Sequence, residues 1–179
     1  MRLFIALDLH SINTYLDTLR ASIGQEAVTL TKDAHLTLQF LGDVTPPVVD
    51  QIETALADVP FSTFSITLAG TGFFPDEERP RVVWLGVEHN DVLIKLQKDI
   101  SVAMRSLGFE QDRRFHPHIT LARIRVLGNR DAFLEKVNGL RAEKVRVPVE
   151  TFALFESTLT PSGPKHDVIG IFPSSRKAN

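Results

Sequence analysis

The sequence predicts an α+β protein in which one β-α-β-α-β unit occurs twice. Short apolar runs with a period of two alternate along the chain with segments whose apolar residues recur at helical spacing, and this order begins again near residue 80. Each half carries a His-x-Thr triplet on its middle strand. There are 31 positions from Phe4 to His35 and 34 from Trp84 to His118, so the two halves keep nearly the same internal spacing.

These observations predict a single domain over residues 1–179 made of two similar lobes. The lobes are expected to span approximately residues 1–76 and 80–173, because the acidic turn between Pro75 and Pro80 is the one plausible boundary. Each lobe is expected to be an antiparallel-type sheet with helices on its outer face. A central groove is expected between the lobes.

The elements of the first half follow from apolar spacing and from turn residues. Thr45 before Pro46 is typical of a helix start, with proline in the first turn. Gly42 stops the strand before it, and Gly70 to Pro75 is predicted as a turn. In order, we expect a strand at 3–7, a helix at 12–23, a strand at 35–41, a helix at 45–59 and a strand at 64–68.

The second half repeats this order. Gly108 is expected to end one helix as its C-cap, and Asn129 to begin the next as its N-cap. In order, we expect a strand at 81–87, a helix at 93–107, a strand at 118–124, a helix at 129–140 and a strand at 145–155. Residues 158–164 are predicted as a loop, and 167–172 as one further strand.

Composition excludes several classes of protein. Hydrophobic residues make up 43% of the 179, which is enough for a buried core, and 20 basic against 22 acidic residues exclude a globally basic nucleic-acid coat. The absence of cysteine excludes disulfides, thiolate metal sites and a cysteine nucleophile. Because the opening apolar run meets Asp8 and no stretch is long enough to span a membrane, a cytoplasmic protein is expected.

The two His-x-Thr triplets are the candidate catalytic residues. Side chains alternate across a strand, so His35 and Thr37 are expected on one face, with Leu36, Leu38 and Phe40 on the other, in the core. The second triplet places His118 and Thr120 on one face in the same way. If the lobes pack about a pseudo-two-fold axis, two imidazoles that titrate near neutral pH face each other across the groove.

Such a pair suits in-line displacement at phosphorus. One histidine takes a proton from the attacking oxygen and the other gives a proton to the leaving oxygen, while two hydroxyl groups hold the phosphate. A cyclic phosphodiester is an attractive substrate because its leaving oxygen stays tethered and its ring is strained, so that no metal is required. The residues alone do not decide which histidine is the acid.

Residues 34–42 and 115–123 resemble the paired HxTx motifs of the 2H phosphoesterases, in the branch of RNA 2′,3′-cyclic phosphodiesterases, also called 2′-5′ RNA ligases. Further matches are Leu3 to Ala6, Pro80 to Val87, and Phe155 to Ser157 followed by Gly163 and Pro164. The two motifs are His35, Leu36, Thr37, Leu38 and His118, Ile119, Thr120, Leu121.

The resemblance implies hydrolysis of RNA 2′,3′-cyclic phosphodiester ends to 2′-phosphomonoesters without a cofactor or metal. It implies that His35 is the proton donor and His118 the proton acceptor, and that Thr37, Thr120 and Arg123 bind the phosphate. RNA ends, single-stranded or from tRNA fragments, are the implied partners, with no membrane and no obligate protein partner. Two positions depart from the family pattern: His116 stands where a basic residue is frequent, and His166 where a tyrosine is frequent.

Charge distribution agrees with a polyanionic substrate. Residues 105–146 hold ten basic and five acidic side chains, a local charge of +5, and the rest of the chain carries −7. A basic groove on an acidic body would attract an RNA end. Arg113, Arg114 and Arg130 are candidates for contacts with the RNA backbone, although solvated helix and strand ends would explain these charges equally well.

Three alternatives remain open. The same histidines could serve reversible 2′-5′ RNA ligation or a small cyclic nucleotide. The chain could be a non-catalytic module that binds RNA ends. It could also be a histidine metal protein, in which His116, His118 and His35 hold an ion, although threonine is a poor zinc ligand. A monomer is expected, because no apolar stripe is left over once the lobes are packed.

Overall fold

The computed structural model describes residues 1–24, 28–110, 114–161 and 163–175. None of the helices in this part of the chain has the length and apolar character that a membrane crossing requires. The elements, in chain order, are β1 (Arg2–Asp8), the 3-10 helix η1 (His10–Ile12), α1 (Asn13–Ile23), β2 (Val28–Leu30), β3 (His35–Asp43), α2 (Pro46–Ala57), β4 (Phe64–Phe74), β5 (Val82–Val87), α3 (Asp91–Ser106), β6 (His118–Ile124), α4 (Arg130–Asn138), β7 (Val145–Val149), β8 (Thr151–Thr160) and β9 (Gly163–Pro173).

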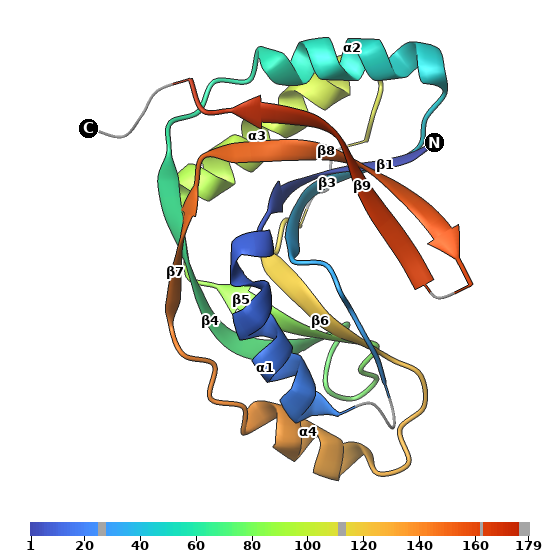
Figure 1. Cartoon of the computed structure of the whole chain (residues 1–179), viewed down its shortest axis with the longest axis vertical. Helices are drawn as coiled ribbons and strands as arrows, with labels where there is room; N and C mark the ends of the chain where they lie inside the picture. The colour runs from blue at the N-terminus through green and yellow to red at the C-terminus, as the bar shows by residue number, and fades with distance from the viewer. Residues whose placement is uncertain (25–27, 111–113, 162, 176–179) are drawn as a thin grey trace.

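The strands form one antiparallel sheet in the order β7-β4-β5-β6-β3-β1-β8-β9, with β2 paired to β6. The sheet divides into two lobes that meet between β3 and β6, where Leu36 pairs with Ile119. Figure 1 shows β1, β3, β8 and β9 in the upper lobe with α2 and α3, and β4 to β7 in the lower lobe with α1 and α4. The predicted α+β architecture, with helices on an antiparallel sheet, is confirmed.

The two lobes exchange elements, so the predicted boundaries at 1–76 and 80–173 do not separate them. β4, from the first half of the sequence, pairs with β5 and β7 of the second half. The predicted strand at 145–155 breaks at Glu150 into β7 and β8, and β8 joins β1 in the other lobe. Helices cross over as well, because α1 packs against β6 and α3 against β3. Each lobe is therefore built from strands and helices of both halves of the sequence.

Two predicted loops are strands instead. β4 continues through the predicted turn after Gly70 as far as Phe74, because Gly72 lies flat beneath the Trp84 indole of β5, where a Cβ would stand only 2.2 Å from the ring. The predicted loop at 158–164 belongs to the β8–β9 hairpin, which pairs as far as Thr160 and Gly163. The outer part of this hairpin is polar and largely exposed. Its residues therefore lack the apolar alternation from which strands are predicted.

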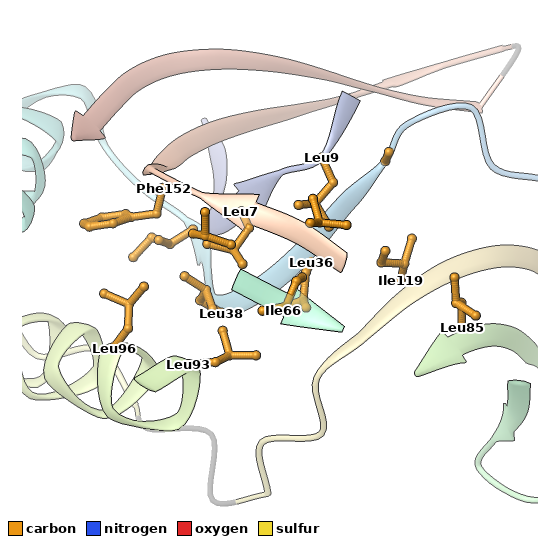
Figure 2. Close-up of a cluster of buried hydrophobic side chains, with 14 of the residues drawn as sticks. Leu7, Leu9, Leu36, Leu38, Ile66, Leu85, Leu93, Leu96, Ile119 and Phe152 are labelled. Atoms are coloured by element: carbon orange, nitrogen blue, oxygen red, sulfur yellow. The ribbon is translucent and has the colours of Figure 1, made fainter. Parts of the chain in front are cut away.

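The core lies on one face of the sheet, beneath the helices. Figure 2 shows that Leu36 and Ile119 point into it together with leucines of α3. Both side chains are completely buried. Because each is the middle residue of a His-x-Thr triplet, its burial turns the flanking polar side chains toward the opposite face of the sheet.

Candidate active site

The two His-x-Thr triplets meet where the lobes join. β3 and β6 run antiparallel, and Leu36 pairs with Ile119. In this register His35 lies across from Thr120, and Thr37 lies across from His118. The structure therefore brings the four predicted side chains together on one face, with each histidine beside the threonine of the other motif.

A β-bulge occurs at the same place in both motifs. Ala6 pairs with Thr37 and Ile5 with Gln39, which leaves Leu38 without a partner in β1. In β6, Leu121 is left over in the same way opposite β5. Each bulge inserts one residue and reverses the alternation of faces beyond it.

The bulges decide where the residues five positions after each histidine point. Arg123 follows His118 by five positions and would lie in the core in a regular strand, but the bulge returns it to the histidine face, where it lines a cavity beside His35. Phe40 has the equivalent position after His35. The prediction that Phe40 lies in the core is wrong, since its side chain is 69% exposed.

His118 has a fixed orientation and tautomer. Its Nδ1 lies 2.7 Å from the carbonyl oxygen of His116, and because a carbonyl can only accept, Nδ1 carries the hydrogen and donates it. The neutral ring therefore keeps its lone pair on Nε2. Burial lowers the pKa of His118 below its usual value, while the hydrogen bond to the carbonyl opposes that shift. The lone pair on Nε2 can accept a proton.

His35 is largely buried, with titratable side chains beside it. Its pKa is lowered to about 4 by burial in the first place, and then by the neighbouring His166. Within the described residues, its buried Nδ1 has no hydrogen-bond partner. Its ring packs beside Phe4, with the two ring centres 5.2 Å apart. Among the groups that shift this pKa, only the charge of Asp33 favours the protonated ring.

Aromatic side chains form similar supports beneath both histidines. Phe4 stacks on Phe155 at 5.0 Å next to His35, and Phe74 packs on Trp84 at 5.4 Å next to His118. Phe74 and His118 pack in a T-shaped contact, with their ring centres 4.8 Å apart. These rings contribute to the burial of both imidazoles, and burial is the largest cause of the two lowered pKa values.

A cavity of about 480 Å³ opens beside His35. Thr120 and Arg123 line it as the sequence predicts, but sequence reasoning missed most of its wall. The lining residues are Thr29, Leu30, Thr31, Lys32, Asp33, His35, Thr120, Arg123, Thr160, Gly163, Pro164, Lys165 and His166. The sequence signals for this wall were Gly163 and Pro164, which match the family pattern, and His166, which departs from it.

Among the residues that the structure describes, the remaining ones named from the sequence do not line this cavity. His116 packs against Trp84, with the ring centres 4.9 Å apart, and stays on the His118 side. Arg130 is bound to the carbonyl oxygen of Glu78 and to Asp131 at the start of α4. Arg114 is exposed, and the prediction for Arg113 falls outside the described residues.

The buried His35 predicts a pH-dependent stability. The unfolded chain binds a proton at His35 below pH 6.5, whereas the folded chain binds it only near pH 4, so folding loses stability as the pH falls through this window. His35 alone is expected to contribute a loss of about 3 kcal/mol. Urea denaturation at pH 7 and pH 4.5 should show a smaller difference for His35→Asn than for the wild type. Equal differences would contradict this expectation.

Comparison with known proteins places the chain in a family. A sequence profile of the 2′-5′ RNA ligase superfamily matches residues 8–160. The RNA 2′,3′-cyclic phosphodiesterase of Methanothermobacter thermautotrophicus is 32% identical over 180 residues, which cover 96% of this chain and 98% of the relative.

Two solved structures share the fold over nearly their whole length. The crystal structure of TT0787 of Thermus thermophilus aligns with a TM-score of 0.79 at 28% identity and covers 97% of each chain. E. coli LigT complexed with 3′-AMP aligns with a TM-score of 0.79 at 26% identity and covers 97% of this chain and 98% of its own. With the paired motifs on one face of this fold, the chain belongs to the 2′-5′ RNA ligase superfamily.

Proposed function

We propose that this chain hydrolyses the 2′,3′-cyclic phosphate at RNA ends to a 2′-phosphomonoester. The observation that carries the proposal is the register that sets each histidine across from the threonine of the other motif, on the face opposite the core. The relative from Methanothermobacter thermautotrophicus, an RNA 2′,3′-cyclic phosphodiesterase, supports the same reaction.

His118 is the proton acceptor in this proposal. Its Nε2 takes a proton from water as the water oxygen forms a bond to phosphorus. The bond between phosphorus and the 3′ oxygen breaks, and its electron pair stays on that oxygen. His35 donates a proton to the 3′ oxygen, which leaves a 3′ hydroxyl and a 2′-phosphate. The donation of Nδ1–H of His118 to the His116 carbonyl supports this assignment.

The remaining residues hold the phosphate. The hydroxyl groups of Thr37 and Thr120 and the guanidinium of Arg123 donate to the oxygens that are not in the ring, where negative charge is concentrated. The cavity beside His35 accommodates the terminal nucleoside, whose 3′ oxygen is the leaving group. LigT has been crystallised with 3′-AMP, which supports a nucleotide site in this fold.

The proposal also covers the substrates, the oligomeric state and the cellular location. We expect ends of single-stranded RNA or of tRNA fragments as substrates and a monomeric, single-domain enzyme in the cytoplasm.

Reversible 2′-5′ ligation is a second candidate function, and Phe40 favours it. This side chain lies past Thr37 along β3, on the histidine face, and its 69% exposed ring offers a stacking surface for a second nucleoside that brings a 5′ hydroxyl. Incubation of a cyclic-phosphate RNA with an RNA bearing a 5′ hydroxyl would then yield a joined product, which Phe40→Ala would reduce more than it reduces hydrolysis.

Product analysis tests the hydrolytic proposal. A short RNA with a 2′,3′-cyclic phosphate is incubated with the enzyme and a chelator, and phosphorus NMR distinguishes a 2′-phosphate from a 3′-phosphate. We expect the 2′-phosphate alone. A 3′-phosphate would place the proton donor at the 2′ oxygen, and an unchanged cyclic end at high enzyme concentration would contradict the hydrolase proposal.

The lowered pKa values predict that kcat/KM and kcat have different pH profiles. In the free enzyme both histidines favour the neutral form, so kcat/KM, which reports the free enzyme, should be greatest below pH 6.5. A bound phosphodiester anion stabilises the protonated rings and raises both pKa values. The profile of kcat should therefore lie at higher pH than that of kcat/KM, and coincident profiles would contradict this.

A further inference from the structure

Three side chains with metal-ligating atoms converge on the wall of the cavity beside His35. One ligand atom from each of Asp33, His35 and His166 lies within 4.8 Å of the other two. Asp33 comes just before β3, and His166 comes from β9, so the group joins distant parts of the chain. In the stretches that the structure describes, no other three such side chains converge in this way.

Two of the three are already held together. His166 Nδ1 lies 2.7 Å from Oδ2 of Asp33, and because a carboxylate accepts, the ring donates this hydrogen bond. The side chain of His166 is only 15% exposed, so the pair is ordered at the cavity wall. His35 packs against His166 at right angles, with ring centres 5.0 Å apart.

His35 contributes the third ligand atom of the group, from its imidazole ring. Its Nδ1 is buried, and the described residues supply no hydrogen-bond partner for it. Buried polar nitrogen atoms are usually paired with protein or water, so an orphaned imidazole nitrogen next to an ordered carboxylate–imidazole pair indicates a position for an additional electrophile. The cavity gives that electrophile an entry path, since all three residues line it.

We propose that Asp33, His35 and His166 form a binding site for a divalent transition-metal ion of the Zn²⁺ class. Imidazole nitrogen and carboxylate oxygen are ligands that Zn²⁺, Co²⁺ and Ni²⁺ share, and three protein ligands leave a position open toward the cavity. An imidazole that holds the ion through one nitrogen cannot become an imidazolium ion, so occupancy of the site prevents proton donation by His35. The site is therefore inhibitory, and this inhibition rests on the proposed hydrolase function.

The geometry of the three ligands and the charges around them determine the expected affinity for the metal ion. Ligand atoms of a tetrahedral zinc lie about 3.3 Å apart, so the ion replaces the hydrogen bond between Asp33 and His166, and the His35 ring closes on it. Lys32 and Arg123 line the same cavity, whereas Lys165 is paired with Asp167. The positive charges of Lys32 and Arg123 oppose a cation, so we expect weaker binding than at a structural zinc site.

Metal binding is measured without reference to activity. Chelator-treated protein, freed of chelator, is titrated with Co²⁺, whose visible absorption reports coordination, and Zn²⁺ is then added as a competitor. His166→Phe and Asp33→Asn each remove one ligand. His89→Phe is the matched control, because His89 and Asp91 form a similar pair at 2.9 Å on the surface outside this cluster.

The wild type and His89→Phe should each show one saturable Co²⁺ spectrum that Zn²⁺ displaces. His166→Phe and Asp33→Asn should bind at least about tenfold more weakly, with unchanged circular dichroism. Absence of saturable binding in the wild type would overturn the proposal, as would binding that both variants retain.

Inhibition is tested separately on a cyclic-phosphate RNA. Zn²⁺ should inhibit the wild type, chelator should reverse the inhibition, and the residual activity of His166→Phe should resist Zn²⁺. Metal that binds without inhibiting would overturn the inhibitory role alone. If the wild type has no activity on this RNA, the hydrolase proposal fails, while the Co²⁺ titration still decides the metal site.

Discussion

His118→Ala and His35→Ala are each expected to lower kcat for a 2′,3′-cyclic-phosphate RNA by about 10²- to 10⁴-fold, the usual contribution of a positioned acid or base. The physical reason is that each ring supplies one of the two proton transfers. KM should change little, because the threonines and Arg123 still hold the phosphate. Steady-state kinetics with purified variants measures both constants.

His89→Ala is the matched control for these variants, because His89 is an exposed histidine that pairs with Asp91 on the surface at the start of α3. It should retain wild-type kinetics. If His35→Ala and His118→Ala both kept kcat close to that of the wild type, the paired triplets would not be the catalytic centre. Loss of RNA affinity with no turnover in any protein would favour the RNA-end binding module instead.

Replacement of both motif threonines is expected to have the second largest effect. Thr37→Val and Thr120→Val preserve shape and remove one hydroxyl donor each, and loss of one such donor to developing negative charge costs about 10²-fold in kcat. The double variant should lose more than either single one. The measurement is kcat of the single and double variants on the same RNA.

Substitution of each motif threonine by serine provides the internal control. Thr37→Ser and Thr120→Ser keep the hydroxyl and should lose much less activity than the valine variants. Valine variants as active as the serine variants would show that the hydroxyl groups do not contact the phosphate. The threonines would then serve only to pack the strands beside the histidines.

The duplicated triplets were predictable from sequence because their information is local. Period-two alternation places the residue between His and Thr in the core, and Leu36 and Ile119 are completely buried as that pattern requires. Matching positions in two similar halves were enough to predict that the triplets would share a groove. The register places each histidine across from the threonine of the other motif. This register depends on the pairing of β3 with β6, which no local pattern encodes.

The two bulges explain why the same reasoning failed a few residues later. Leu38 and Leu121 are apolar residues that read as ordinary core positions, and they become bulges only because β1 and β5 pair around them. Alternation continued past them therefore sends Phe40 to the wrong face. Arg123 was placed at the phosphate by family resemblance, and alternation alone would have buried it.

The wall of the cavity could not be predicted because it depends on distant contacts. Asp33 and His166 are 133 positions apart and meet only when the β8–β9 hairpin folds over the start of β3. Their pairing leaves no periodic trace in the sequence. The exchange of strands between lobes also depends on distant contacts, since the break at Glu150 that sends β7 and β8 to opposite lobes lies within a segment predicted as one strand.

The central claim is that His118 activates water and His35 protonates the leaving 3′ oxygen. It is tested most directly with an RNA end whose cyclic phosphate carries sulfur in place of the bridging 3′ oxygen, because a thiolate leaves without a proton. We predict that this substrate restores most of the activity of His35→Ala and none of that of His118→Ala. Rescue of His118→Ala instead would reverse the two roles, and rescue of neither variant would contradict proton donation to the leaving group by either histidine.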